Sequence, residues 1–235
     1  MFKELDACIL DARFDDDVHV IIVTGHGEKF FCAGANINML KETDASFKYY
    51  FCLHANETLM RLEQTPKLCI AALNGHTVGG GLEVALACDL RIGRKGSFLV
   101  GLPEVDLGVL PGTGGTQRLP RLLGKGKAME LMVEGAKLSF DDGERLGILN
   151  RQFEGATSAK FLEQVVDYAN AFVPPNGAGR AVGRIKRAVQ SGLEMSLGEG
   201  LALEREMQSD LFGSADAKEG LAAYIDKREP KFRGR

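Results

Sequence analysis

The first twelve residues carry apolar side chains at helical spacing, whereas the segments that follow carry short continuous apolar runs. The spacing predicts an amphipathic helix over residues 1–12, with its apolar face formed by Met1, Leu5, Cys8, Ile9 and Ala12. The β-branched residues 18–23 and the apolar residues 68–73 each predict a buried strand. A shorter apolar run over residues 90–92 predicts a third strand.

Longer stretches with helical periodicity alternate with these strands. Residues 42–64 predict a helix, and its expected buried positions are Phe47, Tyr50, Leu53, Leu59 and Leu62. Residues 116–134 and 140–147 also predict helices. Because strands and helices alternate along the chain, the pattern indicates an α/β fold with some parallel strand pairing.

The pattern changes after a pair of prolines. Pro174 and Pro175, followed by the sequence NGAG, predict a boundary between two parts of the chain. Beyond it the pattern is helical, over residues 177–191, 196–211 and 214–228. We therefore expect a core over residues 1–174 and a C-terminal helical segment over residues 175–235.

Composition and charge exclude several classes of protein. The hydrophobic content of 45% is ordinary for a globular chain, and the net charge of −3 offers no overall attraction to nucleic acid or membranes. The five cysteines are scattered without a CxxC pair, so we expect reduced thiols rather than disulfides or a zinc site. No apolar run is long enough to span a membrane. We expect a cytoplasmic protein, or one of the mitochondrial matrix if a leader was removed.

Two glycine-bearing loops are the first candidates for chemistry. The sequences FFCAGANI, residues 30–37, and HTVGGGLE, residues 76–83, each follow a predicted strand and precede a predicted helix. Glycine lets a ligand approach the backbone, and the start of a helix offers free N–H groups. If the two strands are neighbours, one N–H from each loop could bind the same carbonyl oxygen. Tight turning alone is the competing interpretation of either loop.

Two glutamates are the second candidates. Glu83 lies in an apolar stretch at the start of a predicted helix, where the helix dipole alone would favour an acid. Glu104 follows Pro103 in a glycine-rich loop, where a solvated acid is the simplest interpretation. If both side chains converged on one apolar pocket, their pKa values could separate and give an acid and a base.

The chain resembles the enoyl-CoA hydratase/isomerase family, also called the crotonase superfamily. The resemblance covers nearly the whole chain and is most specific in the sequences AGANI, NGHTVGGGLEVALACDLRI and LPEVDLGVLPGTGGTQRLPRLLG. It implies a crotonase-type core, a spiral of ββα units, followed by a C-terminal helical segment that serves trimerisation. It also implies an acyl-CoA substrate and a homotrimer or a dimer of trimers.

The resemblance implies a role for each matching position. Ala35 and Gly80 would donate the two N–H groups of an oxyanion hole for the thioester carbonyl. Glu83 and Glu104 would hold a water molecule between them, which one activates while the other supplies or removes a proton at Cα. The resemblance implies water or substrate binding at Gly112, Ala33, Asn36 and Ile37, and weaker CoA contacts, from a neighbouring subunit, at Lys227 and Phe232.

These roles predict the syn addition of water to a trans-2-enoyl-CoA, giving a 3-hydroxyacyl-CoA. The CoA thioester is the substrate, and we expect no cofactor and no metal. Because both glutamates are present, hydration is favoured over double-bond isomerisation, which remains the alternative activity. A non-catalytic acyl-CoA-binding or RNA-binding module is the other alternative. Its RNA-binding face would be the basic residues Arg180, Arg184, Lys186 and Arg187, although the absence of interleaved aromatic residues makes nucleic acid an unfavoured partner.

The sequence departs from the family pattern at its start. Family members carry a strand and loop before the helix predicted here at residues 1–12, and we expect that segment to pair with residues 18–23 and to contact CoA. Without it, an edge of the sheet would expose unpaired backbone groups. We therefore expect a truncated chain or a misassigned start, and weak or absent CoA binding by this form.

Overall fold

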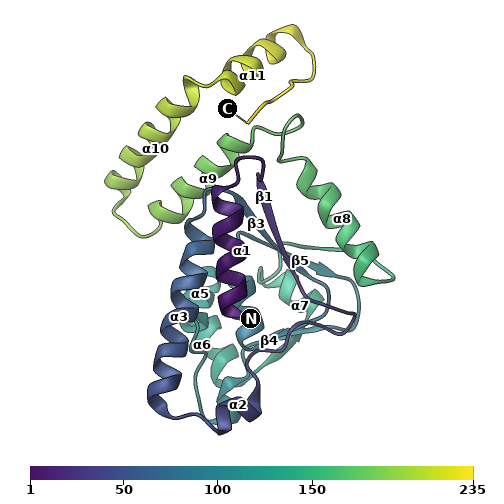
Figure 1. Ribbon diagram of the computed structural model, residues 1–235, viewed down its shortest axis with the longest axis vertical. Coiled ribbons are helices and arrows are strands. Elements are labelled where there is room, and N and C mark those ends of the chain that lie inside the picture. Colours follow the sequence, from purple (N-terminus) through teal and green to yellow (C-terminus); the bar gives the residue numbers. More distant parts are fainter. Residues whose placement is uncertain (235) are drawn as a thin grey trace.

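The computed structural model of the protein describes residues 1–234 and confirms an α/β fold. Figure 1 shows helices packed around two small sheets. The strands are β1 (Val20–Thr24), β2 (Phe30–Cys32), β3 (Leu68–Leu73), β4 (His76–Val78), β5 (Leu90–Arg94), β6 (Leu99–Gly101), β7 (Lys137–Ser139) and β8 (Arg151–Phe153). The helices are α1 (Phe2–Phe14), α2 (Ile37–Lys41), α3 (Ala45–Gln64), α4 (Gly80–Leu86), the 3-10 helix η1 (Glu104–Leu107), α5 (Gly115–Leu123), α6 (Lys125–Val133), α7 (Phe140–Arg145), α8 (Ser158–Asn170), α9 (Gly179–Gly192), α10 (Leu197–Phe212) and α11 (Ala215–Asp226).

The first sheet has the order β1-β3-β5-β8, and all of its strands are parallel. Its central strand β3 is buried on both faces, which explains why residues 68–73 form an unbroken apolar run. Ile70 and Ala72 face one cluster with α8, whereas Cys69, Ala71 and Leu73 face the main core between α1, α3 and α4. The strand expected at residues 18–23 is β1, and it lies at the edge of this sheet.

The second sheet places the glycine loops. Its order is β2-β4-β6-β7, with β2, β4 and β6 parallel to one another and β7 antiparallel. Because parallel strands end at the same edge, the loop after β2, the start of α4 and the turn before η1 lie together. Residues 30–32 and 76–78, expected to be loop, are therefore the strands that hold these loops side by side.

The predicted helices of the core are present, with differences in α3 and in the helix expected at residues 116–134. Asp44 caps α3 by accepting a hydrogen bond from the Phe47 N–H, at 2.7 Å, so the helix begins at Ala45 rather than at residue 42. Gly124, with φ of +80°, divides the helix expected at 116–134 into α5 and α6. Leu59 and Leu62 are buried as expected, whereas three of the expected core positions of α3 are exposed, namely Phe47, Tyr50 and Leu53.

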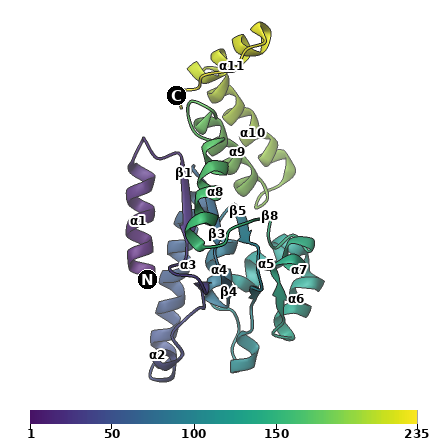
Figure 2. The same cartoon turned by 90° about the vertical axis from the view of Figure 1, so that its right-hand side faces the viewer.

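The C-terminal segment has an anchored part and a projecting part. Helix α9 packs against α3 and β3 of the core. Helices α10 and α11, which we call the C-terminal arm, project beyond α9 at the end of the molecule opposite α2 (Figures 1 and 2). Helix α10 contacts α9 and α11 but has no buried residue. Within residues 1–234 no helix is both long and apolar enough to cross a membrane.

Candidate active site

The glycine loops approach each other closely at the common edge of β2, β4 and β6. A methyl group on Gly34 would lie 3.1 Å from the Gly80 nitrogen, and one on Gly80 would lie 3.5 Å from Gly34 Cα. Gly34 and Gly79 both have positive φ, of +86° and +57°, so glycine is required there for conformation as well as for space. The two backbones therefore form one continuous surface at the start of α4.

Two N–H groups of this surface are free. In the described part of the chain, neither the Ala35 N–H nor the Gly80 N–H donates a hydrogen bond. For Gly80 the reason is general, since the first N–H groups of a helix have no partner within it. Gly79 caps α4 without a side chain, so no polar side chain occupies these donors. A carbonyl oxygen is the kind of group that they can bind.

Glu83 is held rigidly although it is only 2% exposed. The N–H groups of Thr113 and Gly115 both donate to its Oε1, each at 2.8 Å. The Thr113 hydroxyl donates to Oε2. These three donors compensate the buried carboxyl group for the hydrogen bonds with water that it loses on burial.

Glu104 is also partly buried, but one of its carboxyl oxygens lacks the donors that Glu83 has. Oε2 of Glu104 is buried and has no hydrogen-bond partner within residues 1–234. Loss of hydration raises the pKa of Glu104 to about 7; the Glu83 charge adds to the rise, while a backbone hydrogen bond and the Lys48 ammonium oppose it. The carboxyl group of Glu104 is therefore protonated in part of the molecules at neutral pH.

The two carboxyl groups border the turn formed by Gly79 and Gly80 at the start of α4, which we call the glycine turn. A methyl group on Gly79 would lie 3.2 Å from Glu104 Oε1, and one on Gly80 would lie 3.8 Å from Glu83 Oε2. The structure therefore brings together Glu83, Glu104 and Gly80, which lie up to 24 residues apart in the sequence. A protonated acid and a charged acceptor at one turn, beside free N–H donors, can carry out general acid–base chemistry.

The remaining predicted residues of this region lie around the turn. Ala33 and Asn36 are exposed in the loop after β2, and Ile37, the first residue of α2, is 55% exposed. Asn36 caps α2, since its Oδ1 accepts from the N–H groups of residues 38 and 39. Gly112 precedes Thr113, and a methyl group on Gly112 would lie 3.0 Å from the Cys52 sulfur of α3.

Lys227 and Phe232 lie elsewhere in the chain. Lys227 ends α11 with a φ of +54°, and Phe232 packs against Gly220 of the same helix. The backbone N–H of Phe232 donates to the Pro175 carbonyl, at 3.0 Å. Because α11 and α2 lie at opposite ends of the molecule (Figure 1), the chain does not bring these two residues to its own glycine loops.

Most of the basic residues expected on an RNA-binding face are engaged within the chain. Arg180 and Arg184 both pair with Asp210 of α10, at 2.6 and 2.9 Å. Lys186 is buried, and its ammonium group pairs with Asp89 at 2.9 Å. Arg187 alone does not make an open basic surface, so the structure gives no support to an RNA-binding face on α9.

Three residues that support Glu83 were missed from the sequence. The Thr113 hydroxyl contacts the carboxylate directly. Arg118 donates to the Thr113 carbonyl at 3.2 Å, and Glu63 of α3 binds Arg118 through both of its oxygens, at 2.7 and 2.6 Å. The only signal in the sequence is that Thr113 and Arg118 belong to the glycine-rich run PGTGGTQR. That run pointed to its glycines rather than to these two side chains.

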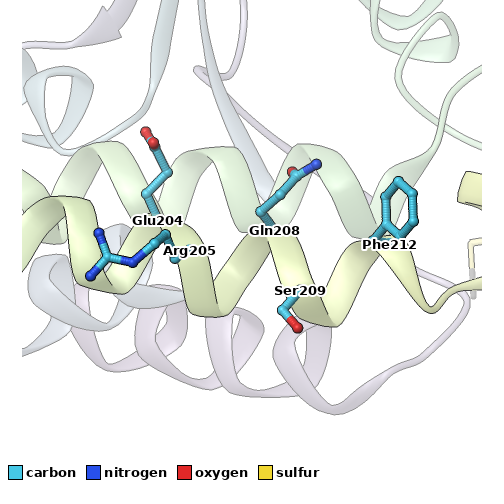
Figure 3. Close-up of a pocket in the computed structure, with 5 residues that line it drawn as sticks. All are labelled: Glu204, Arg205, Gln208, Ser209 and Phe212. Atoms are coloured by element: carbon cyan, nitrogen blue, oxygen red, sulfur yellow. The ribbon is translucent and has the colours of Figure 1, made fainter.

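Two cavities lie away from the glutamates, on the C-terminal segment. One, of about 500 Å³, runs along α10; Figure 3 shows its lining side chains, Glu204, Arg205, Gln208, Ser209 and Phe212. The other, of about 340 Å³, lies between α9, α11 and Phe232. Neither is lined by a residue of the glycine loops or by Glu83 or Glu104, so we place the candidate chemistry at the glycine turn, where burial raises the pKa of Glu104.

Comparisons with known proteins identify the family of the chain. The family model described as enoyl-CoA hydratase/isomerase matches residues 1–235. A short-chain-enoyl-CoA hydratase of Clostridium acetobutylicum is 37% identical, covering 97% of this chain and 85% of that protein. A crotonyl-CoA hydratase of Syntrophomonas wolfei is 32% identical, covering 97% and 86%. An enoyl-CoA hydratase crystal structure from Geobacillus kaustophilus is 46% identical, with a TM-score of 0.94 over 100% of this chain and 87% of that one. The chain therefore belongs to the enoyl-CoA hydratase/isomerase family.

Proposed function

We propose that this member of the family is an enoyl-CoA hydratase, which adds water to a trans-2-enoyl-CoA to give a 3-hydroxyacyl-CoA. One observation carries the proposal: Glu83 and Glu104 border one turn in opposite environments. Hydration of a double bond needs a group that takes a proton from water and a group that gives one to carbon. Glu83, which accepts three hydrogen bonds, and Glu104, whose pKa is raised by burial, can supply these two groups.

The chemistry follows from this arrangement. Glu83 takes a proton from a water molecule while the water oxygen bonds to Cβ of the enoyl group. The negative charge that develops on the thioester oxygen is stabilised by the N–H groups of Ala35 and Gly80. Glu104 gives its proton to Cα, so the pair holds one proton at the end as at the start. Because both carboxyl groups lie at one turn, water and proton add to the same face, and the addition is syn.

The proposed substrate is a short-chain enoyl-CoA. Two relatives support this choice, because their names specify a short-chain enoyl-CoA and crotonyl-CoA. The surface expected to bind the substrate is the loop of Ala33, Asn36 and Ile37 together with Gly112. No group other than the CoA of the substrate takes part in the proposed reaction, so activity should survive dialysis against a metal chelator.

The test is hydration of crotonyl-CoA, followed as the loss of enoyl absorbance. Glu83→Gln and Glu104→Gln should each lower kcat by about 10²- to 10⁴-fold, the usual effect of removing a general acid or base. Glu134→Gln, which changes an exposed glutamate at the end of α6, is the matched control and should keep full activity. If a 3-enoyl-CoA isomerises while crotonyl-CoA stays unhydrated, the chain is an isomerase. Binding of acyl-CoA without turnover of either substrate would make it a binding module.

We also propose that the chain assembles as a homotrimer or as a dimer of trimers through the C-terminal arm. The support is an apolar surface: Leu197 and Phe212 of α10 are 78% and 64% exposed, and Tyr224 and Ile225 of α11 are 85% and 77% exposed. Large apolar side chains grouped on a projecting element are typical of an interface. Assembly would also let Lys227 and Phe232 of one copy reach the CoA site of another.

The assembly is tested by the mass of the native protein in solution. The wild type should have three or six times the chain mass, and Leu197→Glu with Tyr224→Glu should reduce it to that of one chain, because each change buries a charge at the interface. Lys160→Glu on α8, where Lys160 is exposed, controls for added negative charge. A wild-type mass of one chain would contradict the proposal.

A further inference from the structure

Among the described residues, Thr113 alone donates to Glu83 from both its backbone and its side chain. Its N–H donates to Oε1 at 2.8 Å and its hydroxyl donates to Oε2. Thr113 is only 4% exposed, so solvent does not compete for either contact. Gly115 contributes the third donor, to Oε1.

The three contacts distinguish the two oxygens of Glu83. A carboxylate oxygen accepts about two hydrogen bonds along its lone pairs. Oε1 already accepts two, from the N–H groups of Thr113 and Gly115. Oε2 accepts one, from the Thr113 hydroxyl, and it is the oxygen near Gly80 at the glycine turn. One acceptor site is therefore left, on Oε2, beside the free N–H of Gly80.

We propose that Thr113 is a positioning residue, whose hydroxyl fixes the rotation of the Glu83 carboxylate and leaves Oε2 as the proton acceptor. The inference rests on the proposed hydration, in which Glu83 activates water. Without the hydroxyl, the two backbone donors still hold Oε1, but Oε2 loses its only contact. The charged form of Glu83 then has one donor fewer, and its protonated form becomes relatively more favourable.

The backbone carbonyl of Thr113 accepts a hydrogen bond from a side chain that is itself fixed by an ion pair. Arg118 donates to this carbonyl at 3.2 Å, and Glu63 fixes Arg118 through both oxygens. This ion pair is largely buried, with the two side chains 14% and 21% exposed. Two planar groups joined by parallel hydrogen bonds have little freedom of rotation, so the Arg118 guanidinium is held in place where it donates to the Thr113 carbonyl.

Other titratable groups surround Glu83 and must stay unchanged in the test. Glu104 of η1 and Lys48 of α3 act on each other and on the same turn. The thiol of Cys52 lies against Gly112, and the thiol of Cys32 accepts from the Gly34 N–H at 3.5 Å. A substitution at Thr113 leaves all of these groups in place, and the Arg118–Glu63 pair still contacts the backbone carbonyl.

The experiment compares Thr113→Val, which has the same shape without the hydroxyl, with Thr113→Ser, which keeps the hydroxyl. In Thr113→Val, kcat for crotonyl-CoA should fall about 10-fold with KM within about twofold, the effect of losing one hydrogen bond to a charged group. The acidic limb of the pH–rate profile should move to higher pH, because the charged form of the carboxyl group loses a donor. Thr113→Ser should restore both quantities. Thr58→Val removes another buried hydroxyl, on α3, and should change neither.

A second measurement does not need activity. The carboxyl carbon of Glu83, labelled with ¹³C and assigned by its absence in Glu83→Gln, should titrate at higher pH in Thr113→Val than in the wild type. Equal titration in the two proteins, or an unchanged pH–rate profile, would overturn the role of Thr113. Absence of hydration in the wild type would instead overturn the proposed function, while the titration would still decide the role of the hydroxyl. If the valine variant fails to fold, Thr113→Ala takes its place in both measurements.

Discussion

At the scale of single residues, the site depends on two carboxyl groups of the same chemistry in unlike surroundings. Glu83 has a donor for each oxygen, whereas Glu104 has a buried oxygen that finds no partner among residues 1–234. Burial without a partner favours the neutral form of an acid, and burial with three donors permits the charged form. The proposed roles of acid and base thus rest on environment rather than on residue type.

The raised pKa of Glu104 predicts how hydration depends on pH. Since the proposed reaction uses protonated Glu104 as the acid, kcat/KM should fall as pH rises through about 7, the pKa that burial gives this group. The measurement is the initial rate of crotonyl-CoA hydration from pH 5 to pH 9 in buffers of constant ionic strength. A rate that stays flat between pH 6 and pH 9 would contradict the assignment of Glu104 as the acid.

The same pKa supplies a control that is independent of catalysis. The folded pKa of Glu104 lies above the ordinary value of 4.5, so the folded state binds more protons than the unfolded state between those two values. The contribution of Glu104 to stability therefore decreases as pH rises from about 4.5 to about 7. Glu104→Gln, which cannot ionise, should have a higher Tm than the wild type at pH 8 and an equal Tm at pH 4.

The sequence offered candidate residues for the site but not the contacts between them. Glu83 stood out as a carboxylate in an apolar stretch, and the resemblance to the family implied the paired roles of Glu83 and Glu104. The sequence could not show that Thr113 points its hydroxyl at Glu83, since that depends on how α5 packs against α4, 30 residues away in sequence. It also predicted burial of Phe47 and Tyr50 from periodicity alone, and both are exposed because the first half of α3 extends beyond the core.

At the scale of elements, α4 lies so close to β2 that only glycine fits between them. A methyl group on Gly81 would lie 2.1 Å from the Cys32 carbonyl oxygen and 2.9 Å from Cys32 Cβ. The contact is with backbone, which cannot move without moving the strand. Gly81 therefore sets the distance between the helix that carries Glu83 and the strand that leads to Ala35.

Gly81→Ala should for this reason disturb both stability and the site. We expect a loss of about 1–3 kcal/mol in the free energy of unfolding, the usual cost of overpacking a core, together with a large fall in kcat. Denaturant unfolding and the crotonyl-CoA assay measure the two effects. Gly126→Ala in α6, where a methyl group would meet nothing within 4 Å, should instead stabilise by about 0.5–1 kcal/mol. A Gly81→Ala protein as stable and active as the wild type would show that α4 can shift.

Long elements were predictable and short ones were not. The strand β3 and the three C-terminal helices follow the periodicity of the sequence to within about two residues. Strands β2, β4, β6, β7 and β8 have three residues each, which is too short for an alternating pattern to be recognised. Helix α8 was also missed, although it covers one face of β3. The second sheet is thus a product of tertiary packing.

At the scale of the whole molecule, one buried ion pair joins the C-terminal segment to the core. Lys186 of α9 is 3% exposed in its side chain and pairs with Asp89, which precedes β5. Its ammonium group also donates to the carbonyl oxygens of Leu62 and Lys67, at 3.1 and 3.0 Å. This contact crosses the boundary expected at Pro174 and Pro175, so α9 is attached to the core more firmly than the prolines suggest. The division of the chain into a core over residues 1–174 and a helical segment over residues 175–235 stays a prediction.

Lys186→Met should therefore destabilise the protein by about 3–5 kcal/mol, because Asp89 would keep a buried charge without its partner. Thermal or denaturant unfolding measures the effect. Adding Asp89→Asn to Lys186→Met should recover part of the loss, since the uncompensated charge is then removed. Lys127→Met, which breaks an exposed pair with Glu130, should change stability by less than about 1 kcal/mol. A small effect of Lys186→Met would mean that water reaches Asp89.

The absence of buried side chains on α10 has a consequence for the dynamics of a single copy. A helix of 16 residues is marginal in water when little packing supports it. The arm can therefore open and close many times while the parallel sheet stays intact, and its amide hydrogens exchange with solvent through those openings. In an assembly that covers Leu197 and Phe212, opening first requires release of the neighbouring copy. Amide exchange in α10 should then slow as protein concentration rises, while exchange in β3 stays the same.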